Sequence, residues 1–312
     1  MIKKSILFSV FISFSLSQES LKNEEVTSEK PKPPEKQKKK TMEEALKNTK
    51  EIPGLFTIYQ DSTNGKLYML IAKEQLDKEY IHFVHGLNGQ LNAGVFKGSY
   101  RGSKIIKLNR YFNRVEFEVQ NNSMYFDPKN PLSRSSDSNV SSAILASSTI
   151  IAEKESKYLI NVDNVFLSEA LHQITRGFIP GGVNKNPFKL GRLAKERTKY
   201  SEIKNYPQNT DFIVQYVYTN PTPTNWGSDV GLTDPRSVNV TLQHSFIKLP
   251  ENNYKPRFED PRVGYFTTQI TDMTSANDPT PYRDMIHRWH LEKKEPSQSR
   301  SVVKEPIVWW IE

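Results

Sequence analysis

Runs of alternating apolar and polar residues constrain the fold of this chain more than any other feature. In residues 115–119, Val-Glu-Phe-Glu-Val, every second residue is apolar, which is typical of a strand with one buried and one solvent-facing side. Two runs rich in apolar and aromatic residues, 55–61 and 66–73, flank Ser62-Thr63-Asn64-Gly65, a turn sequence that predicts a β-hairpin. We expect strands at residues 55–61, 66–73, 80–86, 103–112, 114–120, 211–220, 237–250 and 262–271.

Helices are expected to be few and short. Residues 41–44, Thr-Met-Glu-Glu, fit a capping box, which predicts a helix that continues to about Lys47. The serine-dense residues 133–148 predict a loop with a short helix. Further helices are expected at 167–174 and in the middle of 281–294. The predicted fold class is therefore α+β and predominantly β, with antiparallel sheets and hairpins and a few short helices.

The first 17 residues have the features of a secretory signal peptide. Lys3 and Lys4 precede an apolar stretch of 12 residues, 5–16, and Ser15-Leu16-Ser17 fits a cleavage site. A membrane span needs ~20 apolar residues, so this stretch is too short for one. No cysteine follows it, which excludes a lipoprotein anchor. We therefore expect a secreted or periplasmic protein without a transmembrane segment.

Residues 18–41 are expected to form a disordered tether. Between Glu19 and Thr41 there are seven lysines, five glutamates and three prolines, with no aromatic residue. Such a segment buries too little apolar area to offset the entropy of ordering it. The chain has a net charge of +8, of which +4 remains once the signal peptide and the tether are left out. That charge, spread over the rest of the chain, argues against a nucleic-acid partner.

The 312 residues are enough for one large domain or two modest ones. Residues 176–192 are rich in Gly, Pro and Asn, which predicts an irregular connection. We expect four parts: an N-terminal β-rich subdomain at 42–175, an irregular connection at 176–200, a second β-rich subdomain at 201–304, and a final strand at 305–312.

The histidines offer little metal chemistry. None of the six is followed by glutamate, so the zinc motif HExxH is absent from the sequence. His82 and His85 lie three apart in an expected strand, where their side chains point to opposite faces and pack as ordinary sheet residues. His287 and His290 would share one face of a helix and could hold zinc as a pair, although a stable site needs a third ligand. The alternative is a basic amphipathic helix that packs Trp289.

Other catalytic patterns are absent as well. The sequence has no GxxxxGK[ST], no GxGxxG and no GxSxG around its serines. With no cysteine in the chain, cysteine nucleophiles, thiolate metal ligands and disulfides are excluded. Carboxylates are plentiful, but no local pattern singles out a catalytic pair. The residues by themselves therefore indicate no catalytic constellation.

Several blocks of the chain resemble a known family. They are GLFTIYQDSTNGKLYMLI at 54–71, FKGSYRGSKIIKLNRYFNRVEF at 96–117, PYRDMIHRWHLEKK at 281–294 and EPIVWWIE at 305–312, together with 76–83, 130–134 and 238–273. The chain from about Thr41 to Glu312 is similar to the N-terminal, non-catalytic half of large secreted bacterial zinc-dependent metalloproteases. In that family a β-rich region of unassigned function precedes a metzincin-like catalytic domain.

The resemblance implies where the chemistry would lie. The family's cofactor is zinc, bound by HExxH in the catalytic domain, and no zinc-site residue can be carried over to this sequence. We expect a chain that is truncated before HExxH and inactive alone. Residues 305–312 would be the first strand of that catalytic domain, and Trp309 and Trp310 would pack against it as a partner. Asp272 is a possible latency residue that binds the zinc, although an Asp that caps a turn explains it as well.

A different class of function also fits the sequence. A secreted β-rich module could recognise a glycan or a cell-surface polymer, with Tyr100, Tyr111 and Trp226 stacking on sugar rings. The alternative is that these aromatic residues belong to the core.

Overall fold

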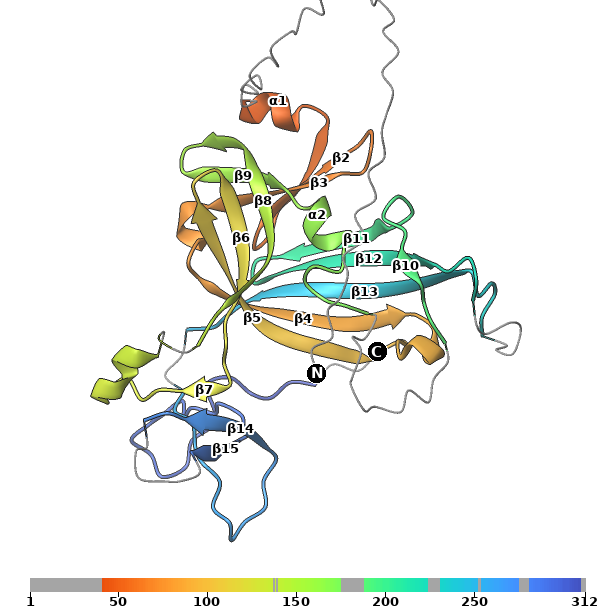
Figure 1. Cartoon of the computed structure of the whole chain (residues 1–312). Coiled ribbons are helices and arrows are strands. Elements are labelled where there is room, and N and C mark those ends of the chain that lie inside the picture. Colours follow the sequence, from red (N-terminus) through yellow and green to blue (C-terminus); the bar gives the residue numbers. More distant parts are fainter. Residues whose placement is uncertain are drawn as a thin grey trace, which may run out of the picture. The chain divides into compact units, whose positions relative to one another are not determined.

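The computed structural model describes residues 41–136, 138, 140–174, 188–223, 231–251, 254–274 and 281–309 (Figure 1). Strands are the main regular structure of these residues, and the helices are short. The α-helices are α1 (Met42–Leu46) and α2 (Asp163–Phe166), and the 3₁₀ helices are η1 (Lys73–Gln75), η2 (Leu91–Ala93) and η3 (Pro131–Ser135). No helix in this part of the chain has the length and apolarity that a membrane crossing requires.

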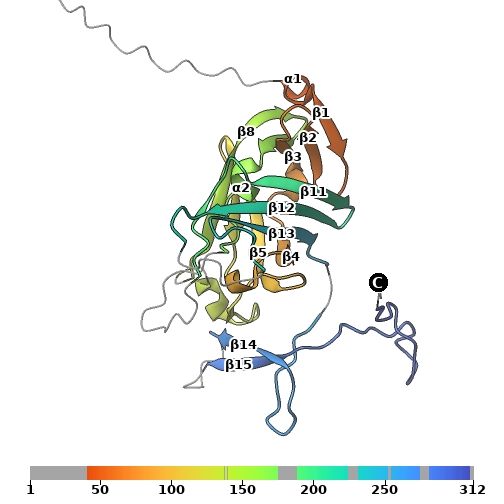
Figure 2. The same cartoon turned by 90° about the vertical axis from the view of Figure 1, so that its right-hand side faces the viewer.

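Twelve strands form one large antiparallel sheet in the order β1-β2-β3-β9-β8-β6-β5-β4-β13-β12-β10, with β11 also paired to β12. The strands are β1 (Thr49–Ile52), β2 (Thr57–Asp61), β3 (Leu67–Ala72), β4 (Glu79–Asn88), β5 (Tyr100–Tyr111), β6 (Arg114–Val119), β8 (Ala143–Lys154), β9 (Lys157–Asn161), β10 (Arg192–Leu193), β11 (Lys199–Tyr206), β12 (Asn209–Thr219) and β13 (Ser237–Lys248). Figure 2 shows β11, β12 and β13 side by side. The expected β-rich fold with antiparallel sheets and few short helices is confirmed.

The large sheet curls until its two ends touch. The backbone N–H of Leu55, before β2, donates to the carbonyl of Tyr206 at the end of β11 (2.7 Å). The Asn205 amide donates to the carbonyls of Ile52 (2.7 Å) and Phe56 (2.6 Å). A Cβ at Gly54 would overlap that amide, so only glycine lets the two ends come this close. We call this contact the seam of the sheet.

The inner face of the sheet encloses an aromatic core. Phe246 of β13 is 1% exposed and lies with its ring centroid 5.8 Å from that of Phe166 and 6.4 Å from that of Phe212. The Phe166 and Phe212 rings stack at 3.9 Å. Successive side chains of a strand point to opposite faces, so β4 and β3 bury every second residue in this core.

A second, three-stranded sheet is formed by β7 (Met124–Tyr125), β14 (Thr267–Asp272) and β15 (Tyr282–Ile286). β14 pairs antiparallel with β15 and parallel with β7. Phe258 adds an isolated bridge to Met285 on the free edge of β15. We call residues 254–274 and 281–309 the C-terminal region.

Several local expectations are confirmed. The capping box is present, with the Thr41 hydroxyl accepting from the Glu44 N–H (3.2 Å). The hairpin forms between β2 and β3, and its turn is held by Asp61, which accepts from the Thr63 N–H (2.8 Å). Gly65 has φ +73°, a conformation that glycine adopts easily.

Other expectations are wrong. Residues 281–294 form β15 and irregular chain instead of a helix, because β15 pairs with β14 through long-range hydrogen bonds. The helix expected at 167–174 lies earlier, as α2. The serine-dense residues 133–148 begin in the short helix η3, as expected, but end in β8, where the Ser148 hydroxyl donates to the Asn161 carbonyl (2.6 Å). Glu116, expected to face solvent, is 7% exposed and bonded to Arg114.

The expected subdomain boundary stays a prediction, since much of it falls on 175–187, outside the described residues. Pairing of β13 with β4 joins strands from both expected subdomains in one sheet. Of the final strand expected at 305–312, residues 305–309 are described, and these form no strand.

Candidate functional site

The C-terminal region differs from the rest of the chain in exposing its large apolar side chains. Ile270 is the one apolar side chain that is buried among its described residues. Eleven large apolar residues are exposed there: Val263, Tyr265, Phe266, Met273, Tyr282, Trp289, Leu291, Val302, Ile307, Val308 and Trp309. Exposed apolar residues mark an interaction site in soluble proteins where they gather into a patch, so the contacts among these residues matter.

Two of these residues, Trp289 and Trp309, form what we call the tryptophan pair. Their rings meet edge to face, with centroids 6.4 Å apart at 76°. The side chains remain 61% and 79% exposed. A tryptophan pair packed on itself, with most of its surface in water, still has most of its burial energy to gain from a partner.

The chain folds back on itself to bring the pair together. The N–H of Lys294 donates to the Val302 carbonyl (2.8 Å), and that of Lys304 donates to the Glu292 carbonyl (2.9 Å). The Lys304 ammonium lies 3.0 Å from the Glu292 carboxylate. This antiparallel return sets the residues after Lys304 beside those before Glu292.

Arg288 fixes the chain next to Trp289. Its guanidinium lies 4.3 Å from the ring centroid of Tyr254 and donates to the Lys255 carbonyl (2.7 Å). The His290 ring meets the same Tyr254 ring edge to face at 5.4 Å. The side chains on both sides of Trp289, those of Arg288 and His290, thus contact the Tyr254 ring, while the Trp289 indole itself is exposed.

The histidine pair expected on a helix is not formed, because the helix is absent. His287 Nε2 lies 2.6 Å from the Thr268 hydroxyl, and His290 Nε2 lies 3.8 Å from Glu292. The two rings therefore engage different partners, and they do not fit a shared zinc ion. No group of three or more metal-ligating side chains occurs within the described ranges.

Asp272 lies at the end of β14 and is 3% exposed. Its carboxylate lies 3.0 Å from the Arg283 guanidinium and accepts from the N–H (2.9 Å) and hydroxyl (2.8 Å) of Thr274. This is the turn-capping arrangement that the sequence offered as the alternative. The latency role stays a prediction, and it would require the carboxylate to leave these partners.

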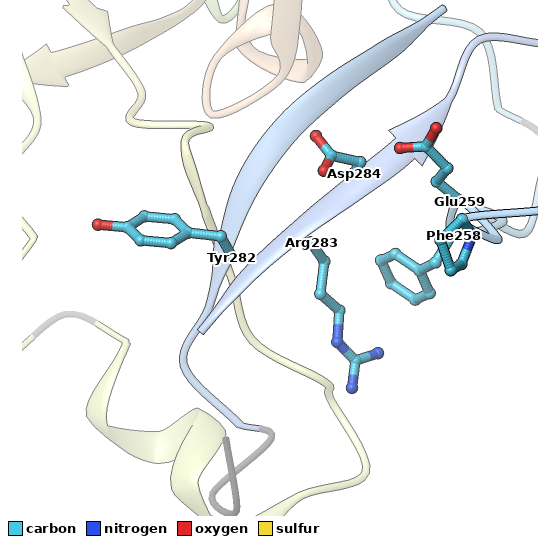
Figure 3. Close-up of a pocket in the computed structure, with 6 residues that line it drawn as sticks. Phe258, Glu259, Tyr282, Arg283 and Asp284 are labelled. Carbon is cyan, nitrogen blue, oxygen red and sulfur yellow. The ribbon is translucent and has the colours of Figure 1, made fainter. Parts of the chain in front are cut away.

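Arg283 also borders a pocket of about 360 Å³ on the free side of β15 (Figure 3). Its lining consists of Phe258, Glu259, Pro261, Tyr282, Arg283 and Asp284. The guanidinium stacks on Phe258, 4.7 Å from its centroid, and in Figure 3 the Asp284 and Glu259 carboxylates point to the other side of the strand. A partner that covered this pocket would meet charges of both signs.

The aromatic residues proposed for sugar stacking are not brought together. Tyr100 and Tyr111 stand at opposite ends of β5, separated by up to about 36 Å of strand. Tyr100 is 64% exposed and its ring contacts that of Phe83. Tyr111 is 53% exposed and its ring contacts the Arg114 guanidinium. The core alternative is therefore wrong for both. Trp226 and Trp310 lie outside the described residues.

A buried polar group was not recognised from the sequence. His82, expected to pack as an ordinary sheet residue, has its Nε2 3.0 Å from His244 Nδ1, and His244 Nε2 lies 2.9 Å from the Tyr216 hydroxyl. His82 and His244 are 162 residues apart, so no local pattern links them. The one sequence feature that they share is their position: each lies in its strand on the face whose other residues are buried.

Comparison with known proteins identifies a family without assigning a function. Residues 98–294 match the model of a domain of unknown function, DUF5117. Comparisons with curated proteins and with solved structures find no match. The matched residues make up more than half of the chain and run from the start of β5 to the irregular residues after β15. The chain therefore belongs to the DUF5117 family.

Proposed function

We propose that this chain is a non-catalytic accessory region of a secreted zinc-dependent metalloprotease, inactive alone. Its C-terminal region would pack against the metzincin-like catalytic domain, which supplies the zinc and the general base. The family resemblance of the sequence suggests the partner. The exposed tryptophan pair is the observation on which the proposal depends.

Energetics support a protein partner for this pair. Full burial of a large apolar side chain stabilises by about 1.5–3 kcal/mol. Tryptophan is also enriched among the few residues that dominate binding energy at protein interfaces. Trp289 and Trp309 are the largest exposed apolar side chains near the end of the described chain.

The partner for a test would be an HExxH domain. DNA downstream of codon 312 is the place to look for it, and the encoded domain would be expressed separately. We expect it to bind the full chain, and we expect Trp289→Ala with Trp309→Ala to weaken the Kd by about 100-fold. Calorimetric titration measures both constants.

Phe112→Ala is the matched control, because Phe112 is 80% exposed but lies on the β5–β6 hairpin. Its Kd should stay within about twofold of the wild type. Equal weakening by the control, or no binding of the HExxH domain to the wild-type chain, would contradict the proposal. A downstream sequence that encodes no HExxH domain would count against it as well.

A second candidate is a glycan-binding module, and the exposure of Tyr100 favours it. The Tyr100 ring lies 5.4 Å from Phe83, which is in turn 5.6 Å from His85, so an aromatic surface is available for a sugar ring. A glycan array with wild type and Tyr100→Ala tests this, with Tyr206→Ala as the exposed control. Binding that depends on Tyr100 but not on Tyr206 would support this class.

A further inference from the structure

The core of the large sheet contains a chain of hydrogen bonds that crosses three strands. It runs from His82 on β4 through His244 on β13 to Tyr216 on β12, and these side chains are at most 1% exposed. The Tyr216 hydroxyl then donates to the backbone carbonyl of Phe166 in α2 (2.8 Å). A polar chain enclosed in an apolar core is stable only when its donors and acceptors are matched.

Each proton in this chain can be assigned. A carbonyl only accepts, so the single hydroxyl proton of Tyr216 points to Phe166. His244 must then donate to Tyr216 from Nε2, which leaves its Nδ1 as an acceptor when the ring is neutral. His82 therefore donates from Nε2 to His244, and its own Nδ1 is a bare acceptor.

That bare nitrogen is the one open end of the chain. His82 Nδ1 is buried and has no hydrogen-bond partner among the described residues. Every other ring nitrogen of the two histidines is already occupied, so an added proton can attach only there. The proton would create an imidazolium inside the core with no acceptor for its new N–H.

The groups around the two histidines make that charge less favourable still. Lys104 on β5 and His172, which follows α2, face His82, and the Phe246 ring lies 5.0 Å away. His172 is in turn faced by Arg101, Lys104 and Glu169. Glu169, the carboxylate in this set, accepts from the Tyr218 hydroxyl (2.7 Å) and from the Ile174 N–H (2.9 Å).

The chain is also one of the attachments of a single segment. Residues 162–174, which we call the α2 strap, cover the inner face of the sheet and bury Val165, Phe166, Leu171 and Ile174. Polar side chains from the sheet hold the strap by its carbonyls. These bonds are Tyr200 to Val162 (3.3 Å), Tyr216 to Phe166 (2.8 Å) and Lys104 to Leu171 (2.7 Å).

We propose that the His82–His244–Tyr216 chain is an acid-sensitive latch, and that proton uptake at His82 Nδ1 releases the α2 strap from the sheet. Release exposes His82 and His172 to water, which hydrates the new charge and separates it from Lys104. This inference is independent of the proposed accessory function, since it concerns the core of the large sheet.

The direction of the pH effect follows from the buried state. Burial is the largest cause that holds the pKa of His82 well below its usual value, and it lowers that of His244 to about 3 and that of His172 to about 4. A released strap lets these histidines titrate near pH 6.5. The closed strap is therefore fully stable above about pH 6.5 and loses stability as the pH falls toward 4. Each histidine that protonates on release raises the opening constant up to tenfold per pH unit.

Hydrogen exchange of the strap, corrected for the intrinsic pH dependence of exchange, measures the opening constant. Between pH 6 and 5 we expect the wild-type constant to rise by about two to three powers of ten. His82→Gln keeps an N–H donor for His244 but does not titrate, so its rise should be smaller by one power of ten. His290→Gln, in the C-terminal region, should leave the rise unchanged.

Three outcomes would overturn the latch. They are strap protection that does not change between pH 7.5 and 5, an equal pH dependence in wild type and His82→Gln, and global unfolding that occurs together with strap exchange. Should His82→Gln not fold, histidine NMR titration of the wild type replaces it. Buried rings that stay neutral until the strap exchanges support the latch, and rings that titrate near pH 6.5 in the closed protein contradict it.

Discussion

The large sheet and the C-terminal region use the same kinds of apolar residue with opposite results. In the sheet, Phe117, Phe212 and Phe246 are enclosed, whereas in the C-terminal region Phe266, Trp289 and Trp309 are mostly exposed. The large sheet can enclose a core because it curls and closes at the seam. A three-stranded sheet has too little area to enclose a core by itself, so its own strands cannot bury its large apolar residues.

Polar groups follow the same division. In the large sheet, buried polar side chains bond to one another or to the backbone, as in the bonds from Asn205 across the seam and in the histidine chain, whose open end is His82 Nδ1. In the C-terminal region the pairs of Arg262 with Asp260 and of Lys304 with Glu292 are at the surface, where ion pairs contribute little. The difference teaches that the large sheet covers its apolar and polar groups with its own contacts, while the C-terminal region leaves most of its large apolar side chains uncovered.

The largest test of this comparison is removal of one aromatic ring from each region. Phe246→Ala should lower the free energy of unfolding by about 3–5 kcal/mol, because the ring is 1% exposed and contacts other aromatic rings on several sides. Trp309→Ala should change it by less than about 0.5 kcal/mol, since its ring is 79% exposed. Urea unfolding followed by far-UV circular dichroism measures both. Similar losses in the two variants would remove the distinction.

The seam gives the next largest effect. In Gly54→Ala the new methyl group would overlap the Asn205 amide, which already donates to two backbone carbonyls. We therefore expect the free energy of unfolding to fall by about 1–3 kcal/mol. Gly264→Ala is the control in the C-terminal region, where the added carbon would meet nothing within 4 Å. Thermal unfolding compares the two. A Gly54→Ala protein as stable as the wild type would show that the seam does not limit stability.

The third test compares two ion pairs within the C-terminal region. Asp272→Ala removes a buried carboxylate that bonds to Thr274 and Arg283. We expect the free energy of local opening of this sheet to fall by about 1–2 kcal/mol. The effect is small because the Arg283 side chain is 40% exposed. Asp260→Ala breaks a pair at the surface and should have no measurable effect. Hydrogen exchange of β14 and β15 reports both. Unchanged exchange in Asp272→Ala would mean that this sheet is held by other contacts.

Much of the large sheet could be predicted from the sequence because alternation and a high content of aromatic and β-branched residues are local properties. The runs at 80–86 and 237–250 correspond to β4 and β13 within a few residues. The errors arose where pairing with another strand decides whether a segment forms a strand. Residues 281–294 have the spacing of an amphipathic helix, yet pairing with β14 makes β15. In β8 the Ser148 hydroxyl bonds to the neighbouring strand β9.

The candidate sites were less predictable, for a physical reason in each case. His287 and His290 were related by helical spacing, and that relation vanished with the helix. Asp272 and Arg283 are paired by the hairpin between β14 and β15, so its turn-capping alternative could be stated in advance but its ion pair could not. The histidine chain joins the consecutive strands β12 and β13 to the distant β4, and only the register of the folded sheet brings the three side chains together.

The smallest expected effect sharpens the comparison by stabilising one region alone. The β8–β9 hairpin turns through Glu155 and Ser156, which have φ +50° and +60°. Asn-Gly adopts this left-handed pair of conformations more easily, so Glu155→Asn with Ser156→Gly should stabilise the large sheet by about 0.5–1 kcal/mol. The same exchange experiment should show unchanged protection of β14 and β15, because the C-terminal region does not depend on that hairpin. A rise in protection of both regions would mean that they unfold as one unit, and the exposed apolar residues would then belong to a structure that the sheet stabilises directly.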